Sequence, residues 1–444
     1  MVTSPVVVFH QRVDDDLGCA SYLIGAETTG EAVVVDPAYE IEPYIEEAKR
    51  HGLKITRVLE THTHADHLSG HGRLALEHGA VVHVHPLGEP EFPFEPLADG
   101  QLVHVGQTAI RVLHTPGHRP EHCCFLVGGI LLTGDSLLIG DAARPDLAVE
   151  AREGAEGLYG SLRRLAGLPG DTGVFPGHVA GSLCATGIST EHSSTIGAEL
   201  KTNRALGFSD LQEFVAAMAS VSAPRPPTIE RVVALNRGPF VGASAPLDPL
   251  QSFDGQVLDV RSPHEFAEGH VRGAINIPLE SSSPGTKAGF VMDQERPVAI
   301  HASSPVDAEA AASRLRAVGL LDLAGYLVEP SATDRLEPIG IQELEQLLAT
   351  DGVQVIDVRE KDERDDGYIP GSRHIPYRLV GELANELENG YPIVTVCNSG
   401  ARAAVAASML AARGIPARPL LDAGVPDWEK RGNPVTAFRR CGSG

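Results

Sequence analysis

The sequence predicts an α/β protein, and three observations lead to that class. Short β-branched runs typical of strands include Val6–Phe9, Ala32–Val35 and Val81–Val84. Segments with helical character, such as Pro43–His51, lie between such runs. A pattern of strand, turn, strand and helix also occurs twice in the second half of the chain. Alternating strands and helices are typical of α/β domains.

The length of 444 residues is too great for one hydrophobic core and predicts roughly three domains. Proline and glycine breakers at 223–227, 238–239 and 245–246 indicate a linker, which a helix over 209–220 precedes. We therefore expect a first domain over 1–245, including a helical extension and this linker. Two smaller domains are expected over 246–332 and 336–444.

The two smaller domains are predicted from an internal repeat. Three segments of the first copy return in the second in the same order, and an alanine-rich helix follows the last of them. The pairs are Val257–Ser262 with Val355–Glu360, Gly269–Pro278 with Gly367–Pro376, and Pro297–Ile300 with Pro392–Val396. Two homologous α/β domains are the simplest explanation.

Composition excludes several classes of protein. The formal net charge of −23 repels phosphate backbones, so nucleic acid is not expected as a partner. No stretch approaches the roughly 20 apolar residues of a spanning helix, and no secretory signal is evident, so we expect a cytoplasmic protein without membrane contact. The six cysteines form no C-x-x-C pair, which excludes a zinc ribbon and disfavours a disulfide framework.

Histidine indicates where a metal would bind. Most of the 19 histidines lie before residue 200. Four clusters combine ligand-type side chains with turns: Thr61–His67, His114–His118, Leu132–Ser136 and Phe175–His178. Sites in α/β domains form at such strand ends.

Together, in this order, the four clusters resemble the metallo-β-lactamase superfamily over residues 1 to about 200. The resemblance implies an αββα sandwich with a metal site at one edge. Two metal positions are possible in that superfamily. One would be lined by His62, His64, His118 and Asp135, and the other by Asp66, His67, His178 and the shared Asp135. A binuclear zinc site, as in glyoxalase II, therefore remains open.

A finer resemblance is to the persulfide dioxygenase branch. It implies one Fe(2+) per chain, held by His62, His118 and Asp135 on one face, with three open positions for persulfide sulfur and O2. The other four residues, His64, Asp66, His67 and His178, would then orient the ligands and the bound substrate.

Two further residues are candidates for substrate binding. Arg144 lies in Gly140–Leu147, which resembles the family segment whose arginine pairs with a carboxylate of the thiol carrier. A surface arginine in a loop is the alternative. Cys184 follows His178 by six residues and is expected near the site, either as a transient sulfur carrier or as an inert buried thiol.

The second repeat carries its own site. Cys397–Arg402 follows a strand and opens a helix, and this C-x-x-G-x-R loop resembles the active site of rhodaneses. Backbone N–H groups would converge on the Cys397 sulfur and stabilise a persulfide anion, and Arg402 would add positive charge. The first repeat has no cysteine there, so we predict a catalytically inactive domain that serves packing, dimer contact or spacing.

The whole chain resembles bacterial persulfide dioxygenase–rhodanese fusions. The resemblance implies oxidation of a thiol persulfide by O2 to sulfite, and sulfur transfer at Cys397 that forms or consumes thiosulfate. A glyoxalase II-like zinc thioesterase fused to a sulfurtransferase is one alternative, and a non-enzymatic sulfur carrier or scaffold is another. A homo-oligomer is expected for such an enzyme, and the identity of the thiol carrier stays open.

Overall fold

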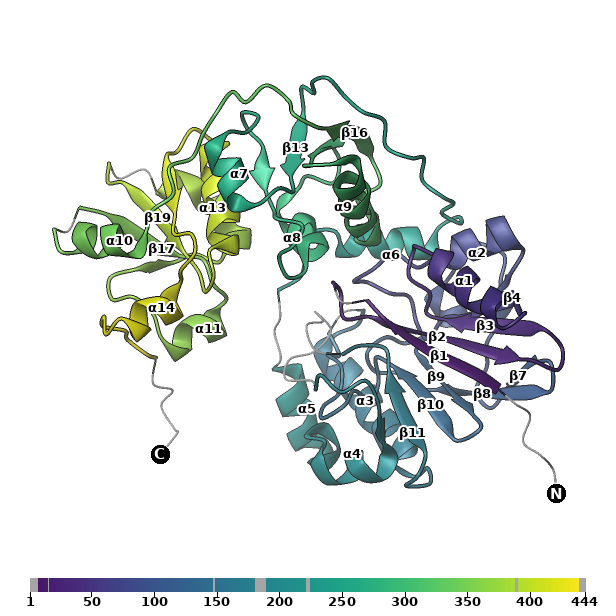
Figure 1. The fold of residues 1–444 in the computed structure, drawn as a ribbon. Coiled ribbons are helices and arrows are strands. Elements are labelled where there is room, and N and C mark those ends of the chain that lie inside the picture. The colour runs from purple at the N-terminus through teal and green to yellow at the C-terminus, as the bar shows by residue number, and fades with distance from the viewer. Residues whose placement is uncertain are drawn as a thin grey trace. The chain divides into compact units, whose positions relative to one another are not determined.

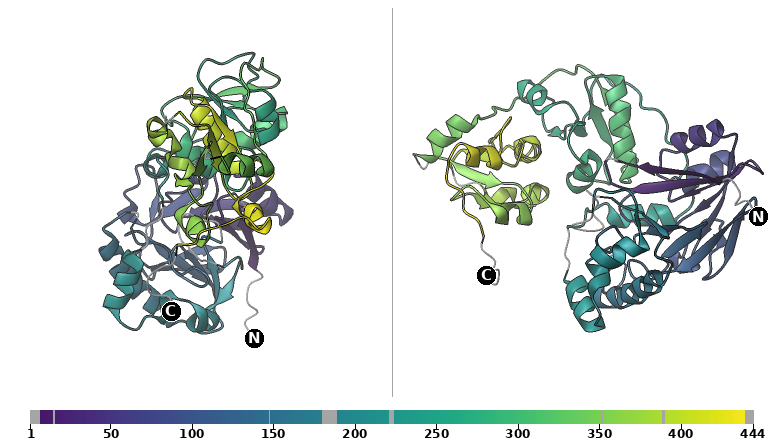
Figure 2. Two further views of the ribbon diagram at one scale, coloured as in Figure 1. Left: turned by 90° about the vertical axis from the view of Figure 1, so that its left-hand side faces the viewer. Right: turned by 60° about the horizontal axis from the view of Figure 1, so that its bottom comes forward.

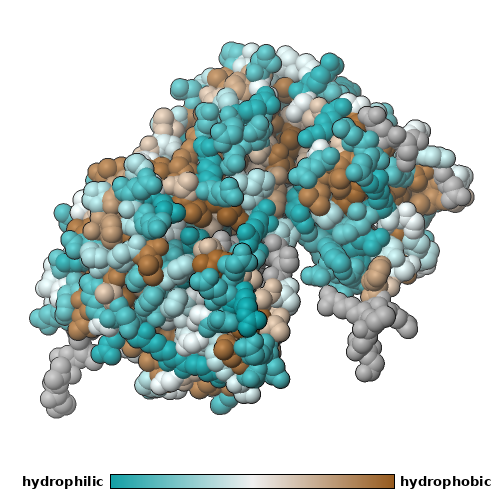
Figure 3. Space-filling model, turned by 180° about the vertical axis from the view of Figure 1, so that it is seen from behind, coloured by the Kyte–Doolittle hydropathy of each residue, from teal (hydrophilic) through white to brown (hydrophobic). Residues whose placement is uncertain are grey.

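The computed structural model describes residues 7–14, 16–146, 148–179, 189–220, 224–350, 352–387 and 390–438. The chain divides into two compact units, one of residues 1–244 with 316–319 and one of residues 245–315 with 320–444. Cys184 lies outside the described residues, so its role stays a prediction. Among the described helices, none is both long and apolar enough to cross a membrane. The face drawn in Figure 3 is mostly hydrophilic, with hydrophobic residues interspersed.

The first unit contains two six-stranded sheets (Figure 1). The first sheet has the order β1 (Val7–Val13), β2 (Ala20–Ala26), β3 (Glu31–Val35), β4 (Lys54–Leu59), β5 (Val81–Val84), β6 (Glu95–Pro96). The second has the order β12 (Ser194–Thr195), β11 (Gly173–Pro176), β10 (Ile130–Gly134), β9 (Cys123–Val127), β8 (Thr108–His114), β7 (Leu102–Val105).

Helices cover the outer faces of these sheets. Helices α1 (Glu42–Arg50) and α2 (His71–His78) pack on the first sheet. Helices α3 (Ala151–Ala166) and α5 (Leu211–Ala219) pack on the second, and α4 (Ile196–Thr202) adds Ile196 to the same core. In both views of Figure 2 the teal helices α3–α5 stay on one side of the strands of this unit.

The alternation of side chains along β2 explains the layers. Tyr22 and Ile24 point into the core between the sheets, whereas Leu23 points out to the core beneath α1 and α2. Because neighbouring side chains face opposite sides of a sheet, a fully apolar strand must be covered on both faces. The predicted αββα sandwich is confirmed.

The segment that we expected to be only a linker contains a helix. Helix α6 (Ile229–Arg237) follows the proline-rich stretch, and its residues Val232 and Asn236 are buried. The prolines at 224, 226 and 227 end before this helix begins, so they do not interrupt it. The interpretation of 223–245 as linker was therefore wrong for 229–237.

The second unit contains two four-stranded parallel sheets. One has the order β14 (Ile275–Asn276), β13 (Gln256–Asp259), β15 (Val298–His301), β16 (Leu323–Leu327), and the other β18 (Arg373–His374), β17 (Gln354–Asp357), β19 (Ile393–Val396), β20 (Ala417–Pro419). Their helices are α7 (Pro263–Glu268), α8 (Pro284–Val291), α9 (Pro305–Ala317), α10 (Ile341–Leu348), α11 (Lys361–Asp366), α12 (Val380–Leu383), α13 (Ala401–Ala411) and α14 (Val425–Lys430). The identical strand order confirms the repeat.

Candidate active sites

Three loops of the first unit bring His62, His118 and Asp135 together. Each loop follows the end of a strand, β4, β8 or β10. The Nε2 atoms of His62 and His118 lie 3.9 and 3.6 Å from Oδ2 of Asp135. Their three ligand atoms all lie within 4.8 Å of one another, and all three residues are buried. One divalent ion could therefore contact all three.

The donor set fits a metal ion. Burial, followed by the neighbouring His64 and His118, holds the pKa of His62 well below its usual value, so its imidazole is neutral. Burial raises the pKa of Asp135, but the bond from His178 outweighs this and lowers it, so the group is a carboxylate. Oδ2 of Asp135 is buried and has no hydrogen-bond partner among the described residues. Such a carboxylate oxygen needs a cation or a donor.

Hydrogen bonds aim the two imidazoles at this position. His62 donates from Nδ1 to Oγ1 of Thr61 (2.9 Å), which in turn donates to Oδ2 of Asp36 (2.8 Å). His118 donates from Nδ1 to the carbonyl oxygen of Arg144 (2.9 Å). Occupying Nδ1 fixes the tautomer and leaves the Nε2 lone pair free for a metal.

His122 was missed by the sequence analysis. Its Nε2 accepts the backbone N–H of Asp135 (3.0 Å), and burial lowers its pKa to about 3, so it is a neutral acceptor. A Cβ at Gly134 would lie 2.7 Å from the same Nε2, and Gly134 has φ +47°. Glycine is therefore required before Asp135. No sequence signal beyond histidine richness identifies His122.

His64 bonds away from the triad. Its Nε2 lies 3.3 Å from both Oδ1 of Asp36 and Oε2 of Glu60. Burial lowers the pKa of His64, but Asp36 and Glu60 outweigh this and raise it well above its usual value. A charged imidazole between two carboxylates is held by them, and the orienting role that we expected for His64 stays a prediction.

Asp66, His67 and His178 form a second cluster beside the triad, and Cys19 joins it. His178 lies between two carboxylates, with Nε2 2.6 Å from Oδ2 of Asp66 and Nδ1 2.6 Å from Oδ1 of Asp135. Sγ of Cys19 lies 3.3 Å from Asp66, 3.4 Å from Nδ1 of His67 and 3.2 Å from Nε2 of His178. Cys19 has no sequence motif and was not predicted here.

Helix α6 holds the loop that carries His64, Asp66 and His67. Asn236 donates from Nδ2 to the carbonyl oxygens of His64 (3.0 Å) and His67 (2.9 Å). Its Oδ1 accepts the N–H of Ser69 (2.9 Å). The loop therefore depends on a residue far along the chain, which composition alone did not single out.

Arg144 is buried, which excludes the alternative of a surface arginine. Its guanidinium forms two bonds to Asp146, at 2.6 and 2.7 Å. Arg225 also contacts Asp146. Asp146 therefore occupies the guanidinium face that we expected to bind a carboxylate of the substrate. Substrate binding by Arg144 stays a prediction.

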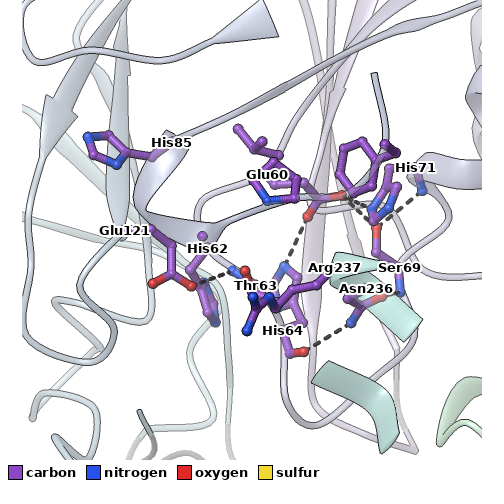
Figure 4. A pocket seen from close by; sticks show the side chains of 14 residues that line it. Glu60, His62, Thr63, His64, Ser69, His71, His85, Glu121, Asn236 and Arg237 are labelled. Carbon is purple, nitrogen blue, oxygen red and sulfur yellow. Dashed lines mark hydrogen bonds and ion pairs between the residues drawn. The ribbon is translucent and has the colours of Figure 1, made fainter. Parts of the chain in front are cut away.

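A small cavity of about 20 Å³ adjoins His62 (Figure 4). Figure 4 shows His62, Glu121 and His85 on one side and Glu60, His71 and Ser69 on the other. Further lining residues include His64, Phe92, Asn236 and Arg237. The carboxylates and the guanidinium of this pocket are bonded within the protein: Glu60 to Ser69 and His71, Glu121 to Arg119, and Arg237 to Glu89.

In the second unit, Cys397 directly follows β19 and lies four residues before α13. The N–H of Gly400 donates to its sulfur (3.1 Å), and Cys397 is 1% exposed. Gly400 has φ +94°, and a Cβ there would meet the Leu421 backbone at 3.2 Å, so glycine suits this turn. One backbone N–H, that of Gly400, is thus directed at the sulfur, and the wider set of N–H groups that we expected there stays a prediction.

The positive charge of Arg402 is neutralised by an ion pair within the protein. Its two terminal nitrogens bond to the carboxylate of Glu363 at 2.6 and 2.7 Å. Burial lowers the pKa of Arg402, but the bonds to Glu363 raise it. The sequence analysis missed Glu363, which lies on another helix with no spacing relation to Arg402.

The strand registers show what replaces Cys397 in the first repeat. Asp357 pairs with Val396 and Asp259 with His301, so Ala302 is equivalent to Cys397. The preceding residue, His301, lies with Nδ1 2.9 Å from Oδ2 of Asp259. This position has no thiol in the first repeat, and the inactivity of that domain stays a prediction.

The fold and donor set define an αββα domain with a candidate metal site, and the second unit adds two α/β domains with parallel sheets. Residues 14–178 match the Metallo-beta-lactamase superfamily, and residues 247–328 and 341–431 each match the Rhodanese-like domain. The chain belongs to the metallo-beta-lactamase superfamily and carries rhodanese-like domains in addition.

Individual relatives agree with this assignment. Over 235 residues the chain is 31% identical to Persulfide dioxygenase ETHE1, mitochondrial, of Homo sapiens, covering 52% of this chain and 87% of that protein. It is 33% identical over 150 residues to Hydroxyacylglutathione hydrolase of Pseudoalteromonas translucida, covering 33% and 56%. A solved Metallo-beta-lactamase from Staphylococcus aureus is 30% identical with a TM-score of 0.67, covering 73% of this chain and 99% of that one.

Proposed function

We propose that the first unit is a mononuclear iron dioxygenase that oxidises a low-molecular-weight thiol persulfide with O2. The observation that carries the proposal is the buried Oδ2 of Asp135, which faces Nε2 of both His62 and His118 without a hydrogen-bond partner among the described residues. Two histidines and one carboxylate on one side of an ion are the ligands of non-haem Fe(2+) oxygenases. Homology to persulfide dioxygenases supports the substrate class.

The second set of ligand residues favours one ion over two. Ligands about 2.0–2.2 Å from a tetrahedral zinc ion stand roughly 3.3–3.5 Å apart, whereas Nε2 of His178 and Oδ2 of Asp66 are 2.6 Å apart. That distance is a hydrogen bond. His64 is likewise engaged with Asp36 and Glu60. These contacts support an orienting role for the second set.

When bound, Fe(2+) would supply open positions at which persulfide sulfur and O2 meet. The overall conversion would be RSSH + O2 + H2O to RSH + SO₃²⁻ + 2 H⁺. The chain's own part is to aim His62 through Thr61, His118 through the Arg144 carbonyl and Asp135 through His178.

The second unit would transfer sulfur at Cys397. A Cys397 persulfide passes its outer sulfur to sulfite, which breaks the S–S bond, returns the thiolate and yields thiosulfate. The N–H of Gly400 stabilises the developing negative charge on sulfur. The reverse transfer from thiosulfate uses the same group. We propose domains over 1–245, 246–332 and 336–444, in a cytoplasmic homo-oligomer.

Metal analysis combined with an oxygen electrode tests this function. We expect one iron per chain and O2 uptake that requires persulfide, both lost in His118→Ala. Cys397→Ser should abolish thiosulfate formation and leave O2 uptake intact. Metal-dependent hydrolysis of a substrate other than a persulfide would overturn the proposal. O2 uptake retained in His118→Ala would overturn it as well. Loss of both activities in Cys397→Ser would contradict separate sites.

A zinc thioester hydrolase is the second candidate. The similarity to hydroxyacylglutathione hydrolases favours it, as does the presence of Asp66, His67 and His178. This candidate requires two metal ions and thioester cleavage without O2. The same metal analysis, run with a thioester substrate under nitrogen, distinguishes it from the dioxygenase.

A further inference from the structure

Cys19 lies where the first sheet meets the metal cluster. It immediately precedes β2, and its backbone forms an isolated antiparallel bridge with His178. The adjoining N–H of Ala20 donates to the carbonyl oxygen of Gly177 (2.7 Å). This backbone pairing fixes the position of the Cys19 side chain, which is 7% exposed.

The Cys19 sulfur occupies one position, here called the corner, of the second cluster formed with Asp66, His67 and His178. Its distances to Oδ2 of Asp66, Nδ1 of His67 and Nε2 of His178 are 3.3, 3.4 and 3.2 Å. Among these donors, Nδ1 of His67 lies 3.3 Å from Oδ1 of Asp66, whereas Nε2 of His178 lies 2.6 Å from Oδ2 of Asp66. The ligand atoms of Cys19, Asp66 and His67 all lie within 4.8 Å of one another, so an ion on the side of the sulfur would have to take the thiol as a ligand or displace it.

We propose that the Cys19 thiol fills the position of a second metal ion and thereby restricts the domain to one ion. This inference rests on the proposed mononuclear function. Cys19 is then a specificity-determining residue for the metal centre. Its bulk keeps out both an ion and the ion-bound water that a hydrolase would use as nucleophile.

His178 bonds the carboxylate ligand of the triad with one nitrogen and the second cluster with the other. Its Nδ1 lies 2.6 Å from Oδ1 of Asp135, which leaves Oδ2 for the single ion. A second ion would recruit Nε2 of His178 and break its bond to Asp66. The Cys19 side chain would thus decide whether these donors hold one ion or two.

Metal stoichiometry of the full chain tests this role. Metal-free protein would be incubated with excess Zn²⁺, desalted and measured by plasma mass spectrometry. Cys19→Ala empties the corner, so zinc should rise from about one to about two per chain. Cys19→Val refills the corner without a donor and should stay near one. Cys123→Ala removes another buried thiol, one in the core between the sheets, and should also stay near one.

The outcomes are distinct. Zinc near one per chain in a folded Cys19→Ala variant, checked by circular dichroism, would overturn the inference while leaving the mononuclear proposal intact. Zinc near two in Cys19→Val would also overturn it, because filling the corner would then not exclude the ion. Two ions in the wild type, with a sulfur-to-metal charge-transfer band on Co²⁺ substitution that Cys19→Ala lacks, would make the thiolate a ligand and overturn both.

Discussion

Replacing Asn236 with alanine tests whether the metal loop is held from outside its own sequence. The side chain forms three hydrogen bonds to the loop, at 3.0, 2.9 and 2.9 Å, and is 5% exposed. A buried hydrogen bond contributes about 1 kcal/mol net, so Asn236→Ala should lower the free energy of unfolding by about 3 kcal/mol. The loop carries His62, so metal affinity should also fall roughly 10- to 100-fold, as when groups that support metal ligands are removed.

Two measurements separate these effects. Competition with a chelator gives the metal affinity, and hydrogen exchange at the Ser69 amide reports the loop itself, because that N–H loses its acceptor. Asn203→Ala is the matched control. Asn203 is equally buried and donates to the carbonyl oxygens of Leu138 and Asp141 and to Glu199, none of them a triad residue. It should lose similar stability and keep its metal. Unchanged Ser69 exchange and metal affinity in Asn236→Ala would refute the reasoning.

Three further predictions concern charged groups. Asp135→Asn removes the charge of the carboxylate ligand and should weaken metal binding more than 100-fold, read as metal lost on dialysis against a chelator; retention would exclude Asp135 as a ligand. Arg402→Lys loses the fork that bonds Glu363 and should slow sulfur transfer about tenfold, with unchanged O2 uptake; an unaltered transfer rate would argue against a role for Arg402. Burial raises the pKa of Asp146, but Arg144 and Arg225 outweigh this and lower it to about 2. Its stabilising contribution is therefore present above the ordinary carboxyl pKa and lost as pH falls through 2, so wild type and Asp146→Asn should converge in stability between about pH 4 and pH 2. A gap independent of pH would contradict that assignment.

Much of the first site could be predicted because its residues lie in short motifs at strand ends. Gly134 before Asp135, and the spacing of His62 to His67, are local signals. The alternation of Tyr22, Leu23 and Ile24 likewise requires two cores, as the sandwich provides.

Pairings between distant residues could not be predicted in this way. Cys19 meets His178 across 159 positions, and Asn236 meets His67 across 169. Neither pairing leaves a periodic trace, because each depends on how the sheets and loops pack. The ion pair between Glu363 and Arg402 could not be predicted for the same reason. What the sequence reveals is the donor set, and what it conceals is which donors are already bonded to one another.

The bonds from α6 to the metal loop also affect the timing of synthesis. The His62 loop leaves the ribosome early, but the amide that fixes it is made more than 170 positions later. At about 5–20 residues per second this delay is roughly 10–35 s. During that interval the nascent loop lacks a clamp, so metal loading belongs to the period after α6 has emerged. A chain that stalls before Asn236 would therefore display the donors without the geometry that retains an ion.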